Sequence, residues 1–284
     1  MADGHLAPHL RRRWWDKGAA LVQLAPRYEL KYWADESQLA DVLGRLAGLL
    51  VRDPHGSDVR PGYMITSLYL DTEDFAYFYE KVEGLKIRSK VRLRRYDDEM
   101  GGFLELKGKR KRRITKSRLR LDSGALERTT RGDTVDLQRM AAGGDHAARV
   151  LLSEFELRQT LVPAVITRYE REAYLLREDP AVRVSIDRRL SAWGQDLVEA
   201  FLHPEVSDLP MLPMLGSVPS GPAILEVKST GPIPPVVAAA LRHADLIRRA
   251  ISKYCYAVLR SGSLPEPNRE RFRVLFPEVP STHA

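Results

Sequence analysis

Polar and apolar residues alternate along several short segments of the chain, and a period of two is typical of β-strands with one buried face. The longest such segment covers residues 86–94, where every even position is a lysine or an arginine. The odd positions between them are Ile87, Ser89, Val91 and Leu93. Charged and apolar residues also alternate at 27–32, 104–109, 182–187 and 225–228. We therefore expect strands that turn a charged face to one side and pack the other face on apolar groups.

The periodicity of apolar residues, together with turn and capping residues, predicts strands and helices along most of the chain. Strands are predicted at residues 27–33, 63–71, 86–96, 103–109, 113–121, 164–177, 182–193 and 223–229. Helices are predicted at 35–50, 145–160 and 236–250, with a short helical turn near 75–82 and a closing element at 254–259. The first of these helices has Asp35 as a capping residue and apolar residues at helical spacing from Leu39 to Leu50. Many antiparallel strands with few helices favour an α+β fold or a barrel.

Both ends of the chain and one internal segment lack this periodicity. Residues 1–25 are predicted to form a flexible N-terminal extension. Residues 203–222 carry five prolines and are predicted to form a long loop. Residues 261–284 form a proline-rich C-terminal tail, expected to be mobile or draped on the surface. The folded domain is therefore expected to span residues 26–260.

Composition narrows the class of protein. The chain has 284 residues, of which 44% are hydrophobic and 29% charged, so it can bury a sizeable core in one large domain or two small ones. It contains no apolar run long enough for a membrane span, and its N-terminus lacks the apolar stretch of a secretory signal. Cys255 is the only cysteine, which excludes an intramolecular disulfide and a cysteine-based zinc cluster. We expect a cytoplasmic enzyme or binding protein.

The charge is concentrated in one region. The net charge of the chain is +7, but residues 86–120 alone hold 15 cations and 4 acids, a local charge of +11. The rest of the chain is therefore at −4. A single basic region predicts a polyanionic partner: nucleic acid, a phosphorylated small molecule, an acidic membrane or a phosphate polymer.

A solvent-exposed sheet face would explain the charges of any one strand. However, five consecutive cations on one face repel one another unless an anion neutralises them, and arginine suits bidentate contacts with phosphate. If several such strands close into a barrel with their charged faces inward, they enclose a polar tunnel. Such a tunnel suits a linear chain of phosphates, with a divalent metal held between phosphate oxygens and a glutamate.

Eight short motifs then occur in an order that resembles a known family. They are RYELKYW (27–33), SLYLDT (67–72), KVRLRRY (90–96), FLELKGK (103–109), TRYEREAY (167–174), VRVSIDRRL (182–190), ILEVKST (224–230) and ISKYCYAVLR (251–260). Over residues 27–260 the chain resembles the VTC (vacuolar transporter chaperone) domain, the polyphosphate polymerase branch of the CYTH or triphosphate tunnel metalloenzymes. The resemblance implies an α+β fold: an antiparallel β-barrel, the triphosphate tunnel fold, with flanking helices. It also implies transfer of the ATP γ-phosphate to polyphosphate, with Mn²⁺ or Mg²⁺ as cofactor.

The resemblance assigns roles to individual residues. It implies phosphate ligands along the tunnel at Lys31, Arg92, Arg94, Lys107, Arg171 and Arg183, and we add Arg88, Lys90 and Lys228, which share their strand faces. Glu226 is implied as the metal ligand, with Glu29 and Glu105 as possible second carboxylates. Lys253, beside Ser252, corresponds to the lysine near the transferred phosphoryl group. The expected catalytic residues are Lys253, Arg92, Arg94 and Glu226.

Other functions stay open at this point. Hydrolytic relatives open with Glu-x-Glu-x-Lys, whereas this chain has Arg27 at the first glutamate, which favours holding phosphate over hydrolysis. A triphosphatase of the same superfamily and a non-catalytic polyphosphate-binding module are the alternatives. A nucleic-acid binder ranks last, because no aromatic residue lies among the cations from Lys86 to Arg95. The cation tract at 109–113 is expected at a hairpin tip, as a collar that attracts anions to the tunnel mouth. The sequence gives no indication of an oligomeric state.

Overall fold

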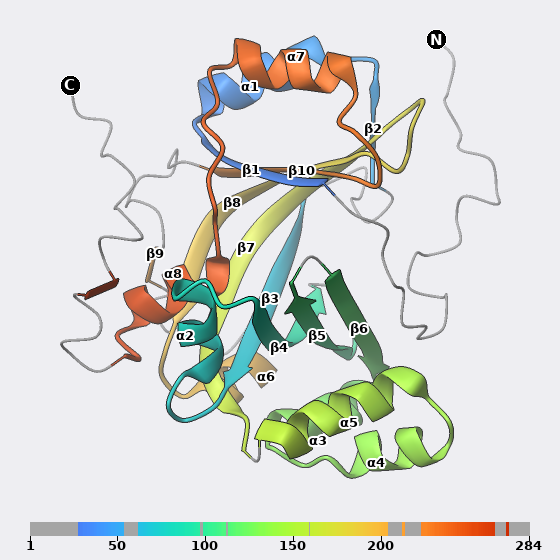
Figure 1. Ribbon diagram of the computed structural model, residues 1–284, viewed down its shortest axis with the longest axis vertical. Coiled ribbons are helices and arrows are strands. Elements are labelled where there is room, and N and C mark those ends of the chain that lie inside the picture. Colours follow the sequence, from blue (N-terminus) through green and yellow to red (C-terminus); the bar gives the residue numbers. More distant parts are fainter. Residues whose placement is uncertain are drawn as a thin grey trace.

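A computed structural model describes residues 28–53, 62–96, 99–111, 113–158, 160–203, 212–213, 223–264 and 271–272. Its centre is one antiparallel sheet with the strand order β1-β10-β8-β7-β3-β4-β5-β6 (Figure 1). These strands are β1 (Tyr28–Ala34), β10 (Ala223–Ser229), β8 (Arg183–Trp193), β7 (Val162–Leu176), β3 (Tyr63–Asp71), β4 (Ile87–Tyr96), β5 (Gly102–Arg110) and β6 (Arg113–Leu121). Two short strands add to the path: β2 (Leu50–Arg52) pairs with β7, and β9 (Leu212–Pro213) pairs with β8.

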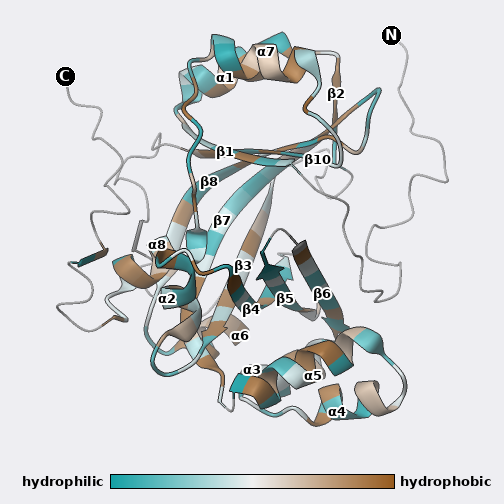
Figure 2. Ribbon diagram, in the orientation of Figure 1, coloured by the Kyte–Doolittle hydropathy of each residue, from teal (hydrophilic) through white to brown (hydrophobic). Residues whose placement is uncertain are grey.

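Helices flank the sheet. In Figure 1, α1 (Glu36–Arg45) and α7 (Pro235–His243) lie together over β1 and β10. The helices α3 (Ser123–Thr130), α4 (Val135–Ala142) and α5 (His146–Arg158) form a group at the opposite end of the molecule. Between these groups lie α2 (Ala76–Val82), α6 (Leu197–Leu202) and α8 (Lys253–Ser261). The helices α3, α4 and α5 carry both hydrophobic and hydrophilic residues, as expected for helices with one buried face (Figure 2).

The apolar residues of the strands pack outward, against the helices. Leu225 and Val227 of β10 belong to one buried cluster, with Leu39 of α1. Leu93 of β4 and Leu104 of β5 belong to a second cluster, which includes residues of α3 and α5. Because neighbouring residues of a strand point to opposite faces, the charged residues between these apolar positions lie on the inner face of the sheet.

The sheet curls so that strands near its two ends meet on this inner face. Lys107 Nζ of β5 lies 3.4 Å from Glu29 Oε2 of β1, although these strands are far apart in the strand order. The edge of β1 is also paired, because Arg249 N donates to Lys31 O at 2.8 Å. The prediction of an α+β fold, an antiparallel β-barrel with flanking helices, is therefore confirmed, and the barrel takes the form of a curled sheet with no pairing between β1 and β6 among the described residues. Within the described residues, no helix has the length and apolar character that a membrane crossing requires.

Most predicted elements are present, with different ends. Strands β3, β6 and β10 match their predicted ranges. The helix predicted at 236–250 ends at His243, since Asp245 adopts a left-handed conformation (φ 50°) and the chain then pairs with β1. The helix predicted at 35–50 ends at Arg45, because Leu50 joins a strand that pairs with β7. Helices α3 and α4 were not predicted.

One expectation about the basic strand needs correction, and a few residues of the tail are described. The alternation holds from Arg88 to Arg94, but Lys86 precedes β4 and Ile87 is 60% exposed, so this end of the strand has no apolar cover. In the tail, Phe272 is buried and packs edge-on against Phe78 of α2 at 5.5 Å. The predicted N-terminal extension, Arg27, nearly all of the 203–222 loop and residues 265–270 and 273–284 of the tail lie outside the described residues.

Candidate functional site

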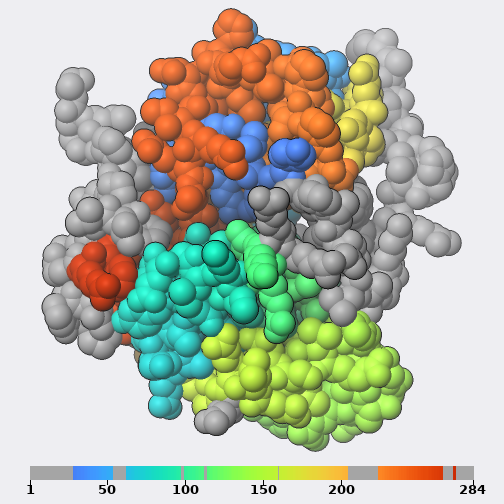
Figure 3. All heavy atoms as spheres, in the orientation of Figure 1, coloured from blue at the N-terminus to red at the C-terminus, as the bar shows by residue number. Residues whose placement is uncertain are grey.

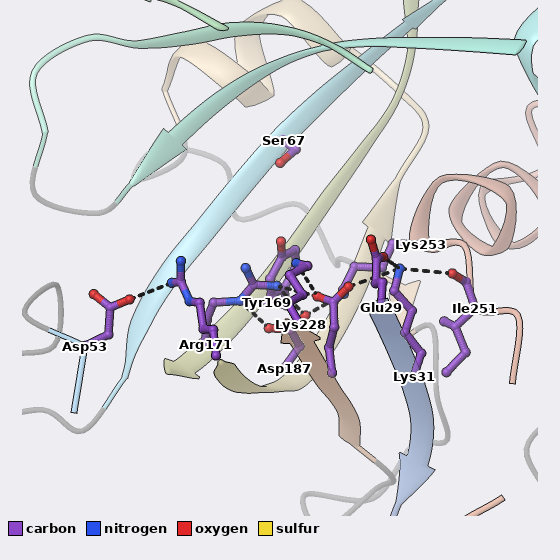
Figure 4. A network of polar contacts seen from close by, with 12 residues as sticks. Glu29, Lys31, Asp53, Ser67, Tyr169, Arg171, Asp187, Lys228, Ile251 and Lys253 are labelled. Atoms are coloured by element: carbon purple, nitrogen blue, oxygen red, sulfur yellow. Dashed lines mark hydrogen bonds and ion pairs between the residues drawn. The ribbon is translucent and has the colours of Figure 1, made fainter. Parts of the chain in front are cut away.

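The inner face of the sheet carries a connected network of ion pairs (Figure 4). Figure 4 shows part of this network, with Asp53 on the left and Glu29, Lys31 and Lys253 on the right. Glu226 of β10 is 3% exposed, and its carboxylate lies 2.9 Å from Lys228 Nζ and 3.4 Å from Lys31 Nζ. Lys31 Nζ also contacts Glu29 at 2.8 Å. Two carboxylates and two ammonium groups thus share a small region in which Glu226 is buried and the other three side chains are partly exposed.

Both carboxylates of this group are held in their ionised form. Burial opposes ionisation of Glu226, but Lys228 and Lys31 outweigh it and hold the pKa of Glu226 well below its usual range. Burial and Glu226 raise the pKa of Glu29, but Lys31 and other cations lower it overall. For Lys228, burial lowers the pKa more than the charges of Glu226 and Glu29 raise it, and the resulting pKa is about 8.

The Glu226–Glu29 pair has the donor set for a hard divalent cation. Their side chains are in direct contact, and Mg²⁺ is typically bound through one or two carboxylates plus substrate phosphate oxygens. Glu105 contacts cations instead, so the structure places Glu29, not Glu105, beside Glu226. In the described part of the chain, no group of three or more metal-binding side chains gathers at one point.

Lys253, the first residue of α8, is held by a buried carboxylate of the sheet. The carboxylate of Asp187 in β8 accepts hydrogen bonds from Nε and Nη2 of Arg171, at 2.6 and 2.7 Å. The same carboxylate lies 2.5 Å from Lys253 Nζ. Burial would raise the pKa of Asp187, but Arg171 and Lys253 lower it to about 2. Lys253 Nζ also lies 4.8 Å from the centre of the Tyr169 ring. Asp187 therefore orients a lysine and an arginine toward the same interior.

Two arginines of β4 and two cations of β6 converge on Glu105 of β5. Arg92 Nη2 lies 2.6 Å from the Glu105 carboxylate, and Lys116 and Arg118 of β6 lie at 3.0 and 3.3 Å. Arg94 lies at 3.8 Å. Burial opposes ionisation of Glu105, but Lys116 and the arginines hold its pKa well below the usual value. One carboxylate therefore offsets part of the repulsion expected along β4, and an excess of positive charge remains.

The first turn of α8 joins these clusters. Ser252 is the N-cap of α8, and its Oγ accepts a hydrogen bond from Lys90 Nζ at 2.8 Å. Lys31 Nζ donates to the carbonyl of Ile251 at 3.4 Å. Arg94 Nη2 donates to the Tyr169 hydroxyl at 3.5 Å, which links the Glu105 cluster to the ring beneath Lys253. The chain thus brings β1, β4, β7, β8 and α8 to one place.

The structure links most of the predicted residues by direct contacts, whereas Arg183 and Arg88 have other partners. The connected set is Lys31, Lys90, Arg92, Arg94, Lys107, Arg171, Lys228, Lys253, Glu29, Glu105 and Glu226. Arg183 instead pairs with Asp53 at 2.8 Å and donates to the Tyr63 hydroxyl at 3.2 Å. Arg88 Nη1 donates to the carbonyl of Leu85 at 2.9 Å.

Sequence reasoning missed several members of the network: Lys116, Arg118, Asp187, Tyr69 and Tyr169. The signal for Lys116 and Arg118 was present, because they alternate with Ser117 and Leu119 on a predicted strand. Tyr69 lies in the motif SLYLDT, but nothing in the sequence indicated that its hydroxyl receives a hydrogen bond from Arg92, at 3.2 Å. Burial would raise its pKa, but Arg92, Arg94 and Lys90 lower it to about 8.

A curled antiparallel sheet with paired cations and carboxylates on its inner face defines an α+β domain with a charged, cation-rich interior. The chain belongs to the VTC domain family, whose profile matches residues 26–261. It is 28% identical over 192 residues to subunit 4 of the vacuolar transporter chaperone complex of Schizosaccharomyces pombe. That match covers 60% of this chain and 26% of the yeast protein, so the chain spans about a quarter of the length of that relative.

Two solved structures show a general likeness. One is an adenylyl cyclase candidate from Hippeastrum with a dominant triphosphatase activity, at 14% identity and a TM-score of 0.48 over 84% of this chain and 97% of that one. The other is an adenylate cyclase candidate from Vibrio parahaemolyticus, at 10% identity and a TM-score of 0.41 over 82% of this chain and 98% of that one.

Proposed function

We propose that this chain is a metal-dependent phosphotransferase that moves the γ-phosphate of ATP onto a growing polyphosphate chain. One observation carries the proposal: cations from both ends of the sheet and from α8 converge on one interior and outnumber the carboxylates there. Membership of the VTC domain family and the likeness to the yeast complex subunit support the same substrate class.

The arginines suit binding of phosphate oxygens. Arg94 is 7% exposed and donates to Ser67 Oγ at 3.2 Å, so its guanidinium is already desolvated and oriented. Arg92 is fixed by Glu105 and Tyr69. Groups oriented in advance stabilise developing charge without reorganising during the reaction. We therefore assign Arg92 and Arg94 to the equatorial oxygens of the transferred phosphoryl group.

Glu226 and Glu29 would hold the divalent cation, Mn²⁺ or Mg²⁺. When bound, the cation would neutralise charge on phosphate oxygens. Lys31 and Lys228, which contact Glu226, would then be free to bind phosphate. The carboxylates and these lysines thus form a charge-matched receptor for a metal–phosphate complex.

The transfer itself needs alignment and charge neutralisation. An oxygen of the terminal phosphate of the acceptor, ionised near neutral pH, attacks the γ-phosphorus of ATP. A new P–O bond forms as the bond to the β-phosphate oxygen breaks, and ADP leaves with that electron pair. Lys253, held by Asp187, would stabilise charge on the transferred group. No side chain has to accept a proton in this step.

Arg92→Ala is expected to weaken polyphosphate binding and to reduce its salt dependence. Loss of one phosphate contact should lower the slope of log affinity against log salt by about 0.7, the value per contact for single-stranded nucleic acid. Titration calorimetry over a series of salt concentrations measures this slope. An unchanged slope would show that Arg92 does not contact the polymer.

The binding of tripolyphosphate is expected to depend on pH through Lys228. Because the pKa of Lys228 is about 8, its charge is lost as the pH rises through that value. Affinity should then fall by up to about tenfold per pH unit above 8. Lys228→Arg keeps the charge and should flatten the profile measured by calorimetry. A profile of equal steepness in Lys228→Arg would rule out this role for Lys228.

One assay tests the proposed reaction. Purified protein is incubated with ATP and Mn²⁺, and the products are separated by size on a gel. Long phosphate polymers are expected. Release of free phosphate from tripolyphosphate without polymer would instead identify a triphosphatase, and metal-independent binding without ATP turnover would identify a binding module.

A further inference from the structure

Asp71 is a buried carboxylate that the proposed mechanism does not use. It is the last residue of β3 and is fully buried. Among the described residues, no cation is a main influence on the pKa of Asp71: burial raises the pKa, and hydrogen bonds lower it only in part. The buried carboxylates of the ion-pair network, in contrast, pair with lysine or arginine. Because a buried carboxylate is costly unless other groups satisfy it, Asp71 depends on its hydrogen-bond donors.

Two of these donors belong to the start of α2. Phe75 stands at the N-cap position with a left-handed backbone (φ 59°), and its side chain makes no capping hydrogen bond. A bulky residue rarely adopts this conformation. Asp71 accepts hydrogen bonds from Tyr77 N at 2.8 Å and from Phe78 N at 3.1 Å, two groups that have no partner within a helix. The carboxylate therefore fixes the start of α2 to the end of β3.

A further hydrogen bond ties α8 to the same carboxylate. The hydroxyl of Tyr254, the second residue of α8, donates to Asp71 Oδ2. Burial, and then the charge of Asp71, raise the pKa of this hydroxyl, so Tyr254 keeps its proton and is the donor. The Tyr254 ring packs against the Tyr69 ring, with centroids 4.9 Å apart. In Figure 3, the teal surface that includes α2 adjoins orange surface from the later part of the chain, in agreement with the contact between α2 and α8.

The first turn of α8 is thus held on two sides. Lys253 and Tyr254 are neighbours in a helix, where successive side chains point about 100° apart. Lys253 reaches Asp187 of β8, and Tyr254 reaches Asp71 of β3. The turn cannot rotate about the helix axis without breaking one of these contacts. The contact to Asp71 is made by groups with no assigned role in binding phosphate, so it does not compete with the substrate.

We infer that Asp71 positions Lys253 for the transfer step through the hydroxyl of Tyr254. This inference rests on the proposed function, because it takes Lys253 as the group next to the transferred phosphoryl group. When phosphate oxygens draw Lys253 away from Asp187, the bond between Tyr254 and Asp71 still holds the turn that carries the lysine. Such control of position matters, since a displacement of about 1 Å at a reacting group costs on the order of a hundredfold in rate.

Tyr254→Phe tests this role, because it removes one hydroxyl and keeps the ring. Tyr77→Phe is the matched control: Tyr77 is also buried, and its hydroxyl donates to Glu154 of α5 at 2.7 Å. Both substitutions remove a buried hydrogen bond to a carboxylate and should lower the thermal unfolding temperature by similar amounts. We expect kcat for ATP to fall about tenfold in Tyr254→Phe alone. KM and the affinity for tripolyphosphate should stay within about twofold of the parent protein.

A double-mutant cycle shows whether Asp71 acts through Tyr254. Asp71→Asn keeps the size of the side chain and replaces one acceptor oxygen by an amide donor. It should lower kcat in the parent protein and lower it little further in the Tyr254→Phe background, because the two residues form one contact. If the two substitutions multiplied their effects on kcat, Asp71 would not act through this hydroxyl, and the inference would be wrong.

The position of Lys253 is also measured without turnover, from its rate of acetylation by an N-hydroxysuccinimide ester, quantified by mass spectrometry. Loss of the Tyr254 hydroxyl should raise this rate about fivefold, whereas Tyr77→Phe should leave it unchanged. An unchanged rate in Tyr254→Phe, equal losses of kcat in both variants, or a loss of tripolyphosphate affinity in place of kcat would each overturn the inference. A parent protein without ATP turnover contradicts the proposed function, and the acetylation rate then decides the inference.

Discussion

Glu226→Gln is expected to abolish polymer synthesis from ATP while the protein stays folded. The substitution keeps the shape of the side chain and removes the charge that Lys31 and Lys228 contact at 3.4 and 2.9 Å. It also removes one of the two carboxylates available to a divalent cation. Loss of such a contact costs on the order of a hundredfold or more in rate. Product yield on a gel, at saturating ATP and a range of Mn²⁺ concentrations, measures the effect.

Two controls make this result specific. Glu172→Gln removes a carboxylate from β7 that pairs with Arg188 at 3.0 Å, outside the network, and should leave synthesis unchanged. Thermal unfolding shows whether Glu226→Gln is folded. A folded Glu226→Gln protein with full product yield would remove Glu226 from the reaction.

Lys253→Met is expected to lower the rate of polymer synthesis by a similar factor, with a smaller effect on polyphosphate binding. Methionine keeps most of the length of the side chain without its charge. Asp187 stays paired with Arg171 through two hydrogen bonds, so the buried carboxylate is not left without a partner. The loss should therefore fall on kcat more than on KM for ATP.

Lys253→Arg separates the charge from its position. It restores a cation next to Asp187 but places it differently, so we expect partial recovery of kcat. If Lys253→Met lowered only the affinity for polyphosphate and left kcat unchanged, Lys253 would be one more phosphate ligand and not the group next to the transferred phosphate.

The alternation of charged and apolar residues was enough to predict the inner face of the sheet. It works for β4 and β10 because each strand has one face packed on an apolar cluster, which leaves the other face for charges. The order of the motifs then predicted Glu226 as a metal ligand and Lys253 as the lysine near the transferred phosphoryl group, without knowledge of any contact. These predictions depend only on local sequence and on the known pattern of a family.

The pairing of the charges could not be predicted in the same way. Asp187 and Lys253 are far apart in the sequence, and only the approach of α8 to β8 brings them to 2.5 Å. Arg183 follows the same alternation as Asp187, yet it turns to Asp53. The end of the helix predicted at 236–250 was wrong for a similar reason. The segment after His243 is not helical, because it pairs with the edge of β1.

The site uses both ends of the folded domain, since Lys31 Nζ donates to the carbonyl of Ile251 across 220 residues. During translation, β1 leaves the ribosome first and α8 almost last, and domains fold as units. A nascent chain that stops before Arg248 lacks Lys253, the Ser252 cap and the Arg249 N–H that pairs with the edge of β1. Ribosome-bound fragments of this domain should therefore be unable to retain polyphosphate, and this capacity should arise only when synthesis of the domain is nearly complete.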